Sequence, residues 1–400
     1  MVRRHPLMSA RVRRNWRGQL IWEQAEGFKP AIEWRQGRQD SGWPLLAPID
    51  LEKAPGFRLF AVEDPGWTDL VLQVHHSLHD GAGTFAVVDD LLAIYARDLG
   101  ATVNLAELHP ERLPTRNKFG LSLRDKLRLL PFQLVGLALS LQLHRRKVAP
   151  LLPAPDRAAP DDGPLPPNLP AVASRSFSPE EFRDLREAAK YLGTGMHDLF
   201  IRDTQAALGA WLKVHGKGGP LDWVRLLIPC NLRRPVDFQL PAANLVSLVI
   251  IDRRAKSLAN RERLLRRVRE DMNWVKRKRL GYVFLVLLGL RRLWPGGIRR
   301  YARRPVCRAT FFLTNVGDIF HNSPLRNPEG KLAVPGAILE DVCLVGPYRP
   351  GTCACLAIGL YAQRLSANLQ YDPGVMTQAQ AEDLVQAFAD QVKLTVESAG

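Results

Sequence analysis

The sequence predicts an α/β protein divided into two parts. With 400 residues and 46% hydrophobic content, the chain can bury a large core and is long enough for two domains. Residues 150–170 contain eight prolines with little periodicity, which is typical of an extended linker. Short apolar runs and longer segments with helical spacing occur on both sides of it. We therefore expect an N-terminal lobe at 1–149, a crossover linker at 150–172 and a C-terminal lobe at 173–400.

The N-terminal lobe begins with short strands. Pro65, Gly66 and Trp67 form a hairpin turn signal before an apolar run, Val71 to Val74, that is predicted as a buried strand. A helix follows, with Thr84 as its candidate cap. The predicted strands are 19–23, 31–34, 57–62 and 71–74, and the predicted helix is 85–99.

A leucine-rich segment, 121–144, comes next. It carries no formal charge from Leu129 to Leu143, and Pro131 interrupts it. A membrane span needs roughly 20 apolar residues, so this segment is too short to be one. We expect a helix that is either buried or lies on a membrane.

The C-terminal lobe alternates helices and strands. Ser178, Pro179 and Glu181 form one helix start, and Thr377 with Gln380 forms a capping box for the last helix. Apolar and polar residues alternate over 365–371, which is typical of a half-buried strand. The predicted helices are 179–191, 194–212, a basic helical region at 257–303 and one after Thr377; the predicted strands are 223–229, 244–251, 311–317, 356–361 and 365–371.

The stretch 71–85, VLQVHHSLHDGAGTF, holds the candidate chemistry. His75, His76, Asp80 and Gly81 lie on a loop between a strand and a helix, where side chains can be both rigid and exposed. An imidazole titrates near neutral pH, so it can accept and return a proton. Glycine at 81 and at 83 lets a substrate approach the backbone.

Structural roles compete with these functions. For His75 we favour packing, and for Asp80 we favour loop architecture over proton transfer. A metal cluster of His75, His76, His79 and Asp80 is a weaker alternative, because no second group of ligands has metal-binding spacing. His79 is assigned no role, and no metal site is predicted.

The string HHSLHDG resembles the signature of the chloramphenicol-acetyltransferase-like superfamily. That superfamily includes condensation domains of nonribosomal peptide synthetases, plant BAHD acyltransferases and bacterial wax ester synthase/diacylglycerol acyltransferases. The resemblance implies two lobes, each a mixed sheet with flanking helices, and an active-site tunnel between them. It also implies that His76 is the general base, that Asp80 forms an internal ion pair, and that Gly81 leaves room for the thioester arm.

Weaker resemblances follow in the order of the superfamily. HPLMSARV at 5–12 is similar to a run that a first strand and helix normally precede, so we expect the true start codon to lie upstream. TGMHDLF at 194–200 carries His197 where asparagine is usual, and we expect a packing or helix-start role for it. PCNLR at 229–233 is similar to a P-x-N-L-R segment, whose Arg233 either pairs with Asp80 or faces an acyl carrier.

One further resemblance points to a subgroup. FFLTNVG at 311–317 is similar to a serine-asparagine-valine stretch of the wax ester synthase group. Thr314 and Asn315 there either hold the oxyanion or the thioester carbonyl, or simply end a strand. The Asp-Phe-Gly-Trp-Gly string of the condensation and BAHD groups does not occur in the sequence. The wax ester synthase group is therefore the nearest resemblance.

The positive charge is concentrated in one region. The net charge is +16, and residues 253–304 contain 18 Lys or Arg and three acidic residues. Apolar runs such as 281–290 interrupt this region, which suits a membrane surface better than a nucleic-acid groove. Peripheral membrane contact through 121–146 and 257–304 and a solvated basic helix face remain equal alternatives. No recognised nucleic-acid motif accompanies the charge.

The cysteines indicate a reducing compartment. All five lie in the second half, their number is odd, and no secretory signal is present. Cys353 and Cys355 are expected as buried strand residues rather than a redox pair. We expect a cytoplasmic protein, with membrane contact at the inner face as the alternative.

These observations together predict an acyltransferase. The acyl donor would be an acyl thioester, acyl-CoA first, that acts as co-substrate, and no metal or prosthetic group is expected. The acceptor would be a hydroxyl or amine of a lipid-like or small molecule. Two alternatives remain: condensation-type transfer from a carrier-protein thioester, and an inactive superfamily member that acts as a membrane-associated binding module.

Overall fold

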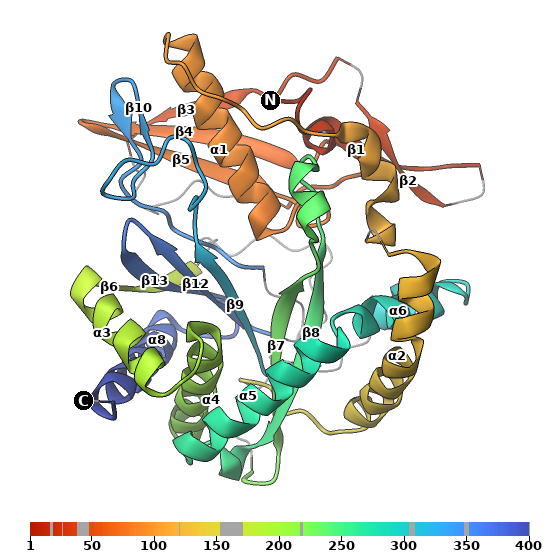
Figure 1. The fold of residues 1–400 in the computed structure, drawn as a ribbon, viewed down its shortest axis with the longest axis vertical. Coiled ribbons are helices and arrows are strands. Elements are labelled where there is room, and N and C mark those ends of the chain that lie inside the picture. The colour runs from red at the N-terminus through yellow and green to blue at the C-terminus, as the bar shows by residue number, and fades with distance from the viewer. Residues whose placement is uncertain are drawn as a thin grey trace.

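The computed structural model describes residues 1–16, 19–25, 27–37, 48–119, 121–152, 171–216, 219–303, 309–347 and 352–399. Figure 1 shows the N-terminal half, in red to orange, beside a C-terminal half in green to blue. The N-terminal elements are β1 (Ala10–Arg14), β2 (Leu20–Gln24), β3 (Ile32–Gln36), β4 (Phe57–Asp64), β5 (Trp67–Val74), α1 (Gly81–Asp98) and α2 (Leu123–His144).

The C-terminal half contains the larger sheet. Its six strands are ordered β6-β13-β12-β9-β7-β8, whereas the N-terminal half has a three-stranded sheet, β3-β4-β5, and the hairpin β1-β2. The C-terminal elements are β6 (Ala171–Phe177), α3 (Pro179–Tyr191), α4 (Met196–His215), β7 (Trp223–Asn231), β8 (Val246–Arg254), α5 (Arg261–Lys278), α6 (Tyr282–Arg292), α7 (Gly297–Arg303), β9 (Phe311–Asp318), β10 (Ala333–Val334), β11 (Ala337–Ile338), β12 (Ala354–Tyr361), β13 (Arg364–Tyr371) and α8 (Gln378–Glu397).

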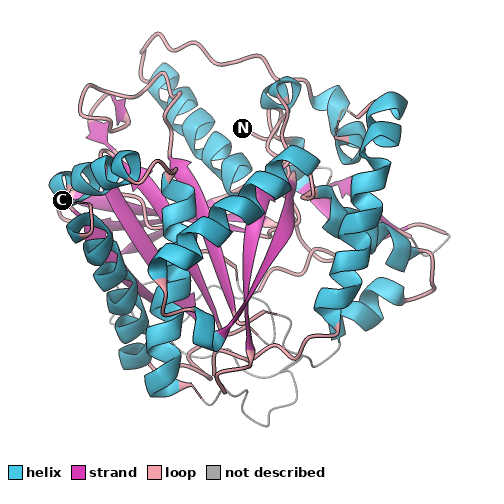
Figure 2. Cartoon of the chain, turned by 60° about the horizontal axis from the view of Figure 1, so that its bottom comes forward, coloured by secondary structure: helices cyan, strands magenta, loops and turns pink. Residues whose placement is uncertain are grey.

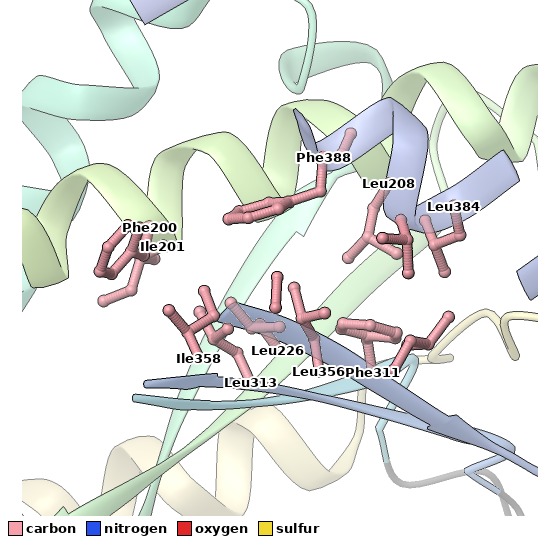
Figure 3. Close-up of a cluster of buried hydrophobic side chains, with 14 of the residues drawn as sticks. Phe200, Ile201, Leu208, Leu226, Phe311, Leu313, Leu356, Ile358, Leu384 and Phe388 are labelled. Carbon is pink, nitrogen blue, oxygen red and sulfur yellow. The ribbon is translucent and has the colours of Figure 1, made fainter. Parts of the chain in front are cut away.

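Helices α3, α4, α5 and α8 cover one face of the six-stranded sheet (Figure 2). The main core lies between them. Figure 3 shows Phe388 of α8 and Leu208 of α4 facing Leu226, Leu313 and Ile358 from three strands of the sheet. All five side chains are nearly inaccessible to solvent. This core anchors the C-terminal half and fixes the strands whose ends approach the motif.

The hairpin β4–β5 delivers the motif. Asp64 pairs with Trp67, so Pro65 and Gly66 form a two-residue turn, and Gly66 has a φ of +87° that suits glycine. The predicted hairpin is therefore confirmed. The prediction of a buried strand at 71–74 is wrong, because only Val71 is buried there. In the three-stranded sheet β5 is an edge strand, which reduces its cover.

The ends of the predicted linker belong to the C-terminal half. Leu151 and Leu152 are buried in its core, and Ala171 starts β6. The rest of the predicted linker, 153–170, lies outside the described residues. The described connection is therefore shorter at both ends than the proline pattern suggests.

The leucine-rich segment forms one helix, α2. Ser122 caps it through a capping box with Asp125, and Pro131 lies inside it. Its buried residues are Gln133, Gly136 and Ser140, so the prediction of a buried helix is wrong for its leucine side. A search of the described residues finds one segment, Pro110–His144, with the length and apolar composition to cross a membrane, and 17% of its apolar window is buried.

Candidate active site

The HHSLHDG loop runs from the end of β5 to the first turn of α1. Asp80 is the N-cap of α1, and its Oδ1 accepts a hydrogen bond of 2.9 Å from the amide of Gly83. The prediction that Thr84 caps the helix is wrong. Thr84 lies inside the first turn, where its hydroxyl donates to the carbonyl of Asp80 at 3.1 Å.

Asp80 joins the two halves of the protein. Arg233, in the loop after β7, donates to Oδ2 at 2.7 Å and to Oδ1 at 2.8 Å. The amide of Leu245 also donates to Oδ2 at 2.8 Å. The side chains of Asp80 and Arg233 are 1% and 8% exposed. Of the two alternatives for Arg233, the structure shows the ion pair, and this buried guanidinium does not face a partner.

The imidazole of His76 is held in one tautomer. Its Nδ1 lies 2.9 Å from the carbonyl oxygen of His79. Because a carbonyl oxygen can only accept, the proton of the neutral ring is on Nδ1, and Nε2 keeps its lone pair. Asn244, just before β8, donates to the carbonyl of His76 at 2.6 Å. An exposed residue with a free Nε2 on a loop fixed at both ends is a suitable general base.

The other two histidines of the loop differ in environment. His75 is partly buried, its Nδ1 lies 2.8 Å from the hydroxyl of Ser77, and burial lowers its pKa. This agrees in part with the expected packing role. His79 is 1% exposed, and neither ring nitrogen has a hydrogen-bond partner among the described residues. Burial lowers the pKa of His79 to about 4, so its ring is neutral at physiological pH.

Sequence reasoning missed the contribution of His79. Its backbone carbonyl fixes the tautomer of His76, and its buried side chain holds that carbonyl in place. A variable position within a motif gives no signal for a backbone role.

The two glycines have different surroundings. A Cβ on Gly83 would lie 3.0 Å from the carbonyl oxygen of Ala243, so this glycine allows α1 to pack against the loop before β8. The predicted substrate approach at Gly83 is therefore wrong. A Cβ on Gly81 would have only ordinary contacts, the nearest at 3.5 Å from Val316 at the end of β9. The structure thus brings the end of β9 next to the motif.

Thr314 and Asn315 lie on that same strand. As neighbours on a strand, they point to opposite faces of the sheet, so they do not converge on one oxygen. Asn315 accepts from the amide of Gly317 at 3.0 Å, and its Nδ2 lies 3.4 Å from Nδ1 of His197. Burial lowers the pKa of His197, in keeping with the expected packing role.

His5 is a second residue whose contribution the sequence did not reveal. Its Nδ1 accepts from the amide of Ala242 at 2.9 Å, and its Nε2 donates to Asp90 of α1 at 2.8 Å. Arg4 donates to the same carboxylate. The N-terminal segment therefore ties α1 to the loop that carries Asn244.

A pocket of about 500 Å³ lies beside the motif. His75 and Ser77 form one wall, and the hairpin β1–β2 and residues 49–52 form the others. Most of its lining is apolar: Val12, Leu20, Ile21, Trp22, Ile49 and Leu51. The pocket can therefore hold an aliphatic or aromatic group next to the HHSLHDG loop.

The fold is that of condensation domains. No family model matches the sequence. The first condensation domain of the calcium-dependent antibiotic synthetase, in complex with a substrate analogue, superposes with a TM-score of 0.64 at 15% identity, over 100% of this chain and 85% of that one. The epimerization domain from the third module of tyrocidine synthetase B gives a TM-score of 0.63 at 11% identity, over 100% and 87%.

A third structure extends the likeness to polyketide synthases. The condensation domain of the Monacolin K polyketide synthase gives a TM-score of 0.62 at 12% identity, over 99% of this chain and 87% of that one. The predicted two-lobed, chloramphenicol-acetyltransferase-like α/β fold is thereby confirmed. At these identities the likeness concerns the fold, and the nearness to the wax ester synthase group stays a prediction.

Proposed function

We propose that the protein is an acyltransferase that moves an acyl group from a thioester to a hydroxyl or amine, with His76 as the general base. The observation that carries this proposal is the fixed tautomer of His76, whose Nδ1 is 2.9 Å from the carbonyl of His79. Asp80 and Arg233 act as positioning residues, because their ion pair holds the loop on which His76 lies.

The reaction begins when Nε2 of His76 takes the proton of the acceptor. The acceptor oxygen or nitrogen then attacks the thioester carbonyl, and a tetrahedral oxyanion forms. The carbon–sulfur bond breaks, and the departing thiolate takes back the proton from His76. General base catalysis of this kind contributes about 10²–10⁴-fold, and positioning of the reactants adds to it. In this scheme Gly81 leaves room for the thioester arm, and either Thr314 or Asn315 interacts with the substrate.

For the substrates we propose acyl-CoA and a lipid-like acceptor. The apolar pocket beside His75 and Ser77 supports an aliphatic group on one substrate. The net charge of 253–304 favours the anionic phosphates of coenzyme A. A carrier-protein thioester is the second candidate donor. It is favoured by the likeness to a structure that describes condensation domain-mediated chain release from the enacyloxin polyketide synthase.

The test measures thiol release by wild type and His76→Ala, with mixed alcohol and amine acceptors. Acyl-CoAs of several chain lengths form one arm, and phosphopantetheinylated acyl carrier proteins form the other. His321→Ala is the matched control, because His321 is exposed and lies outside the motif.

Acceptor-dependent release that falls by about 10²-fold or more in His76→Ala, and not in the control, supports the proposal. The arm with turnover identifies the donor. Absence of release from both donor classes contradicts acyl transfer and favours the binding-module alternative.

A further inference from the structure

Helix α2 presents a continuous apolar stripe to solvent. The stripe consists of five leucines spaced by three, four or seven residues, which places them on one helix face. Their exposed fractions range from 49% at Leu130 to 74% at Leu123. At 1.5 Å per residue the stripe is about 27 Å long. Its members, called the outer stripe below, are Leu123, Leu127, Leu130, Leu134 and Leu141.

The opposite face of α2 is attached to the body of the protein. Gly136 lets α6 approach closely, because a Cβ there would lie 2.4 Å from Val283. Gln133 donates to the carbonyl of Arg279 at 3.2 Å, and Nζ of Lys278 lies 4.1 Å from the ring centroid of Phe132. Helix α2 therefore cannot rotate to bury the outer stripe without losing these contacts.

Helix α6 adds a second exposed apolar group. Leu290, Leu293 and Trp294, at its end and just after it, are 39%, 73% and 62% exposed. Figures 1 and 2 show α2 and α6 together at one flank of the molecule, opposite the flank with α3 and the C-terminus. A tryptophan beside leucines is typical of the boundary between water and lipid.

Positive charge surrounds the same flank. Arg124, Lys126 and Arg128 are exposed near the N-terminal end of the outer stripe, and Arg145 and Lys147 are exposed just beyond its C-terminal end. The region 253–304, which contains α5 to α7, carries 15 more positive than negative charges. The middle of the stripe is uncharged, so apolar and cationic groups are arranged as a band with basic ends.

We propose that the outer stripe of α2 and the end of α6 bind the surface of an anionic lipid bilayer. The leucines and Trp294 would enter the acyl boundary, and the basic residues would contact anionic headgroups. This surface does not depend on the chemistry of the HHSLHDG loop. Charge complementarity selects the occupant, because basic residues border the apolar band at both ends.

Contact in the plane of the bilayer explains the structure of α2 better than a span does. The first turns of the helix contain three basic residues, and its inner face carries Gln133 and Ser140 against the protein. Those groups stay with the protein when the helix lies on the bilayer, with one face outward.

The test is sedimentation of the full chain with vesicles. One set contains phosphatidylcholine with phosphatidylglycerol, and the other contains phosphatidylcholine alone. Leu127→Glu/Leu134→Glu removes the stripe, and Arg124→Gln/Lys126→Gln/Arg128→Gln removes charge. The matched control is Val214→Glu/Leu394→Glu, since both residues are exposed apolar side chains away from α2, at 77% and 44%.

Wild type and the control should bind the anionic vesicles and bind neutral vesicles much more weakly. The triple charge variant should bind about 100-fold more weakly, because each basic residue near such a surface contributes about a fivefold factor. The leucine variant should lose binding while its circular dichroism stays unchanged.

Three results would overturn the proposal. One is absence of wild-type binding to anionic vesicles. A second is binding that survives Leu127→Glu/Leu134→Glu. The third is a dimer, detected by sedimentation equilibrium and dissociated by the same variant, which would identify a second copy of the chain as the occupant of the stripe.

Discussion

Replacement of Asp80 by asparagine should destabilise the whole protein. The substitution keeps the size of the side chain but removes the charge that faces Arg233. Two guanidinium nitrogens and the amides of Gly83 and Leu245 donate to this carboxylate. In the variant, the guanidinium of Arg233 stays buried without its counter-charge.

The expected loss follows from burial. The two side chains are 1% and 8% exposed, so water cannot replace the missing partner. Removal of one member of a buried pair costs about 3–5 kcal/mol, which is a large share of the roughly 5–15 kcal/mol that stabilises a typical protein. Removal of both charges in Asp80→Asn/Arg233→Met should cost less than the sum of the two single changes.

Urea unfolding followed by fluorescence and circular dichroism measures this loss. The matched control is Glu397→Gln, which removes an exposed pair with Lys393 and should change stability by less than about 0.5 kcal/mol. A loss below about 1 kcal/mol in Asp80→Asn, or single effects that simply add in the double variant, would refute the reasoning.

Three other predictions concern the motif and the core. The pKa of His79 falls from 6.5 to about 4 on folding, so the unfolded chain takes up this proton first; the contribution is complete above pH 6.5 and decreases by up to about 3 kcal/mol as the pH falls towards 4, and His79→Leu should flatten this part of a stability-versus-pH curve. Gly83→Ala should cost about 1–2 kcal/mol in a urea titration because Ala243 is too close, whereas Gly81→Ala should change stability by less than about 1 kcal/mol and reduce turnover. Burial raises the pKa of Cys355 to about 12, so peptide mass mapping after iodoacetamide at pH 8 should find Cys355 unmodified in the native protein and modified in urea.

Local signals predicted most of the secondary structure. The capping boxes at Ser178 and Thr377 are confirmed because they depend on residues three positions apart. The same logic applies to Ser122 and Asp125, which the sequence analysis did not use. Strand β6 was missed because its start adjoins the proline-rich stretch and only part of it is buried.

Long-range contacts were predictable only through resemblance. Asp80 and Arg233 are 153 positions apart, and no periodicity connects them. The start of the helix was misplaced at Thr84, because the cap comes from a carboxylate that also serves the distant Arg233. Strand β8 begins at Val246 instead of 244, because Asn244 uses its side chain to hold the carbonyl of His76.

The loop between β7 and β8 has a consequence for dynamics. Its residues contact the motif through Arg233, Asn244 and Leu245, and they contact His5 through Ala242. The amides of Gly83 and Leu245 both donate to one carboxylate, although they belong to different halves of the chain. Their hydrogen exchange therefore measures separation of the two lobes. Equal exchange rates at both amides would show that the base and its support form and open as a single unit.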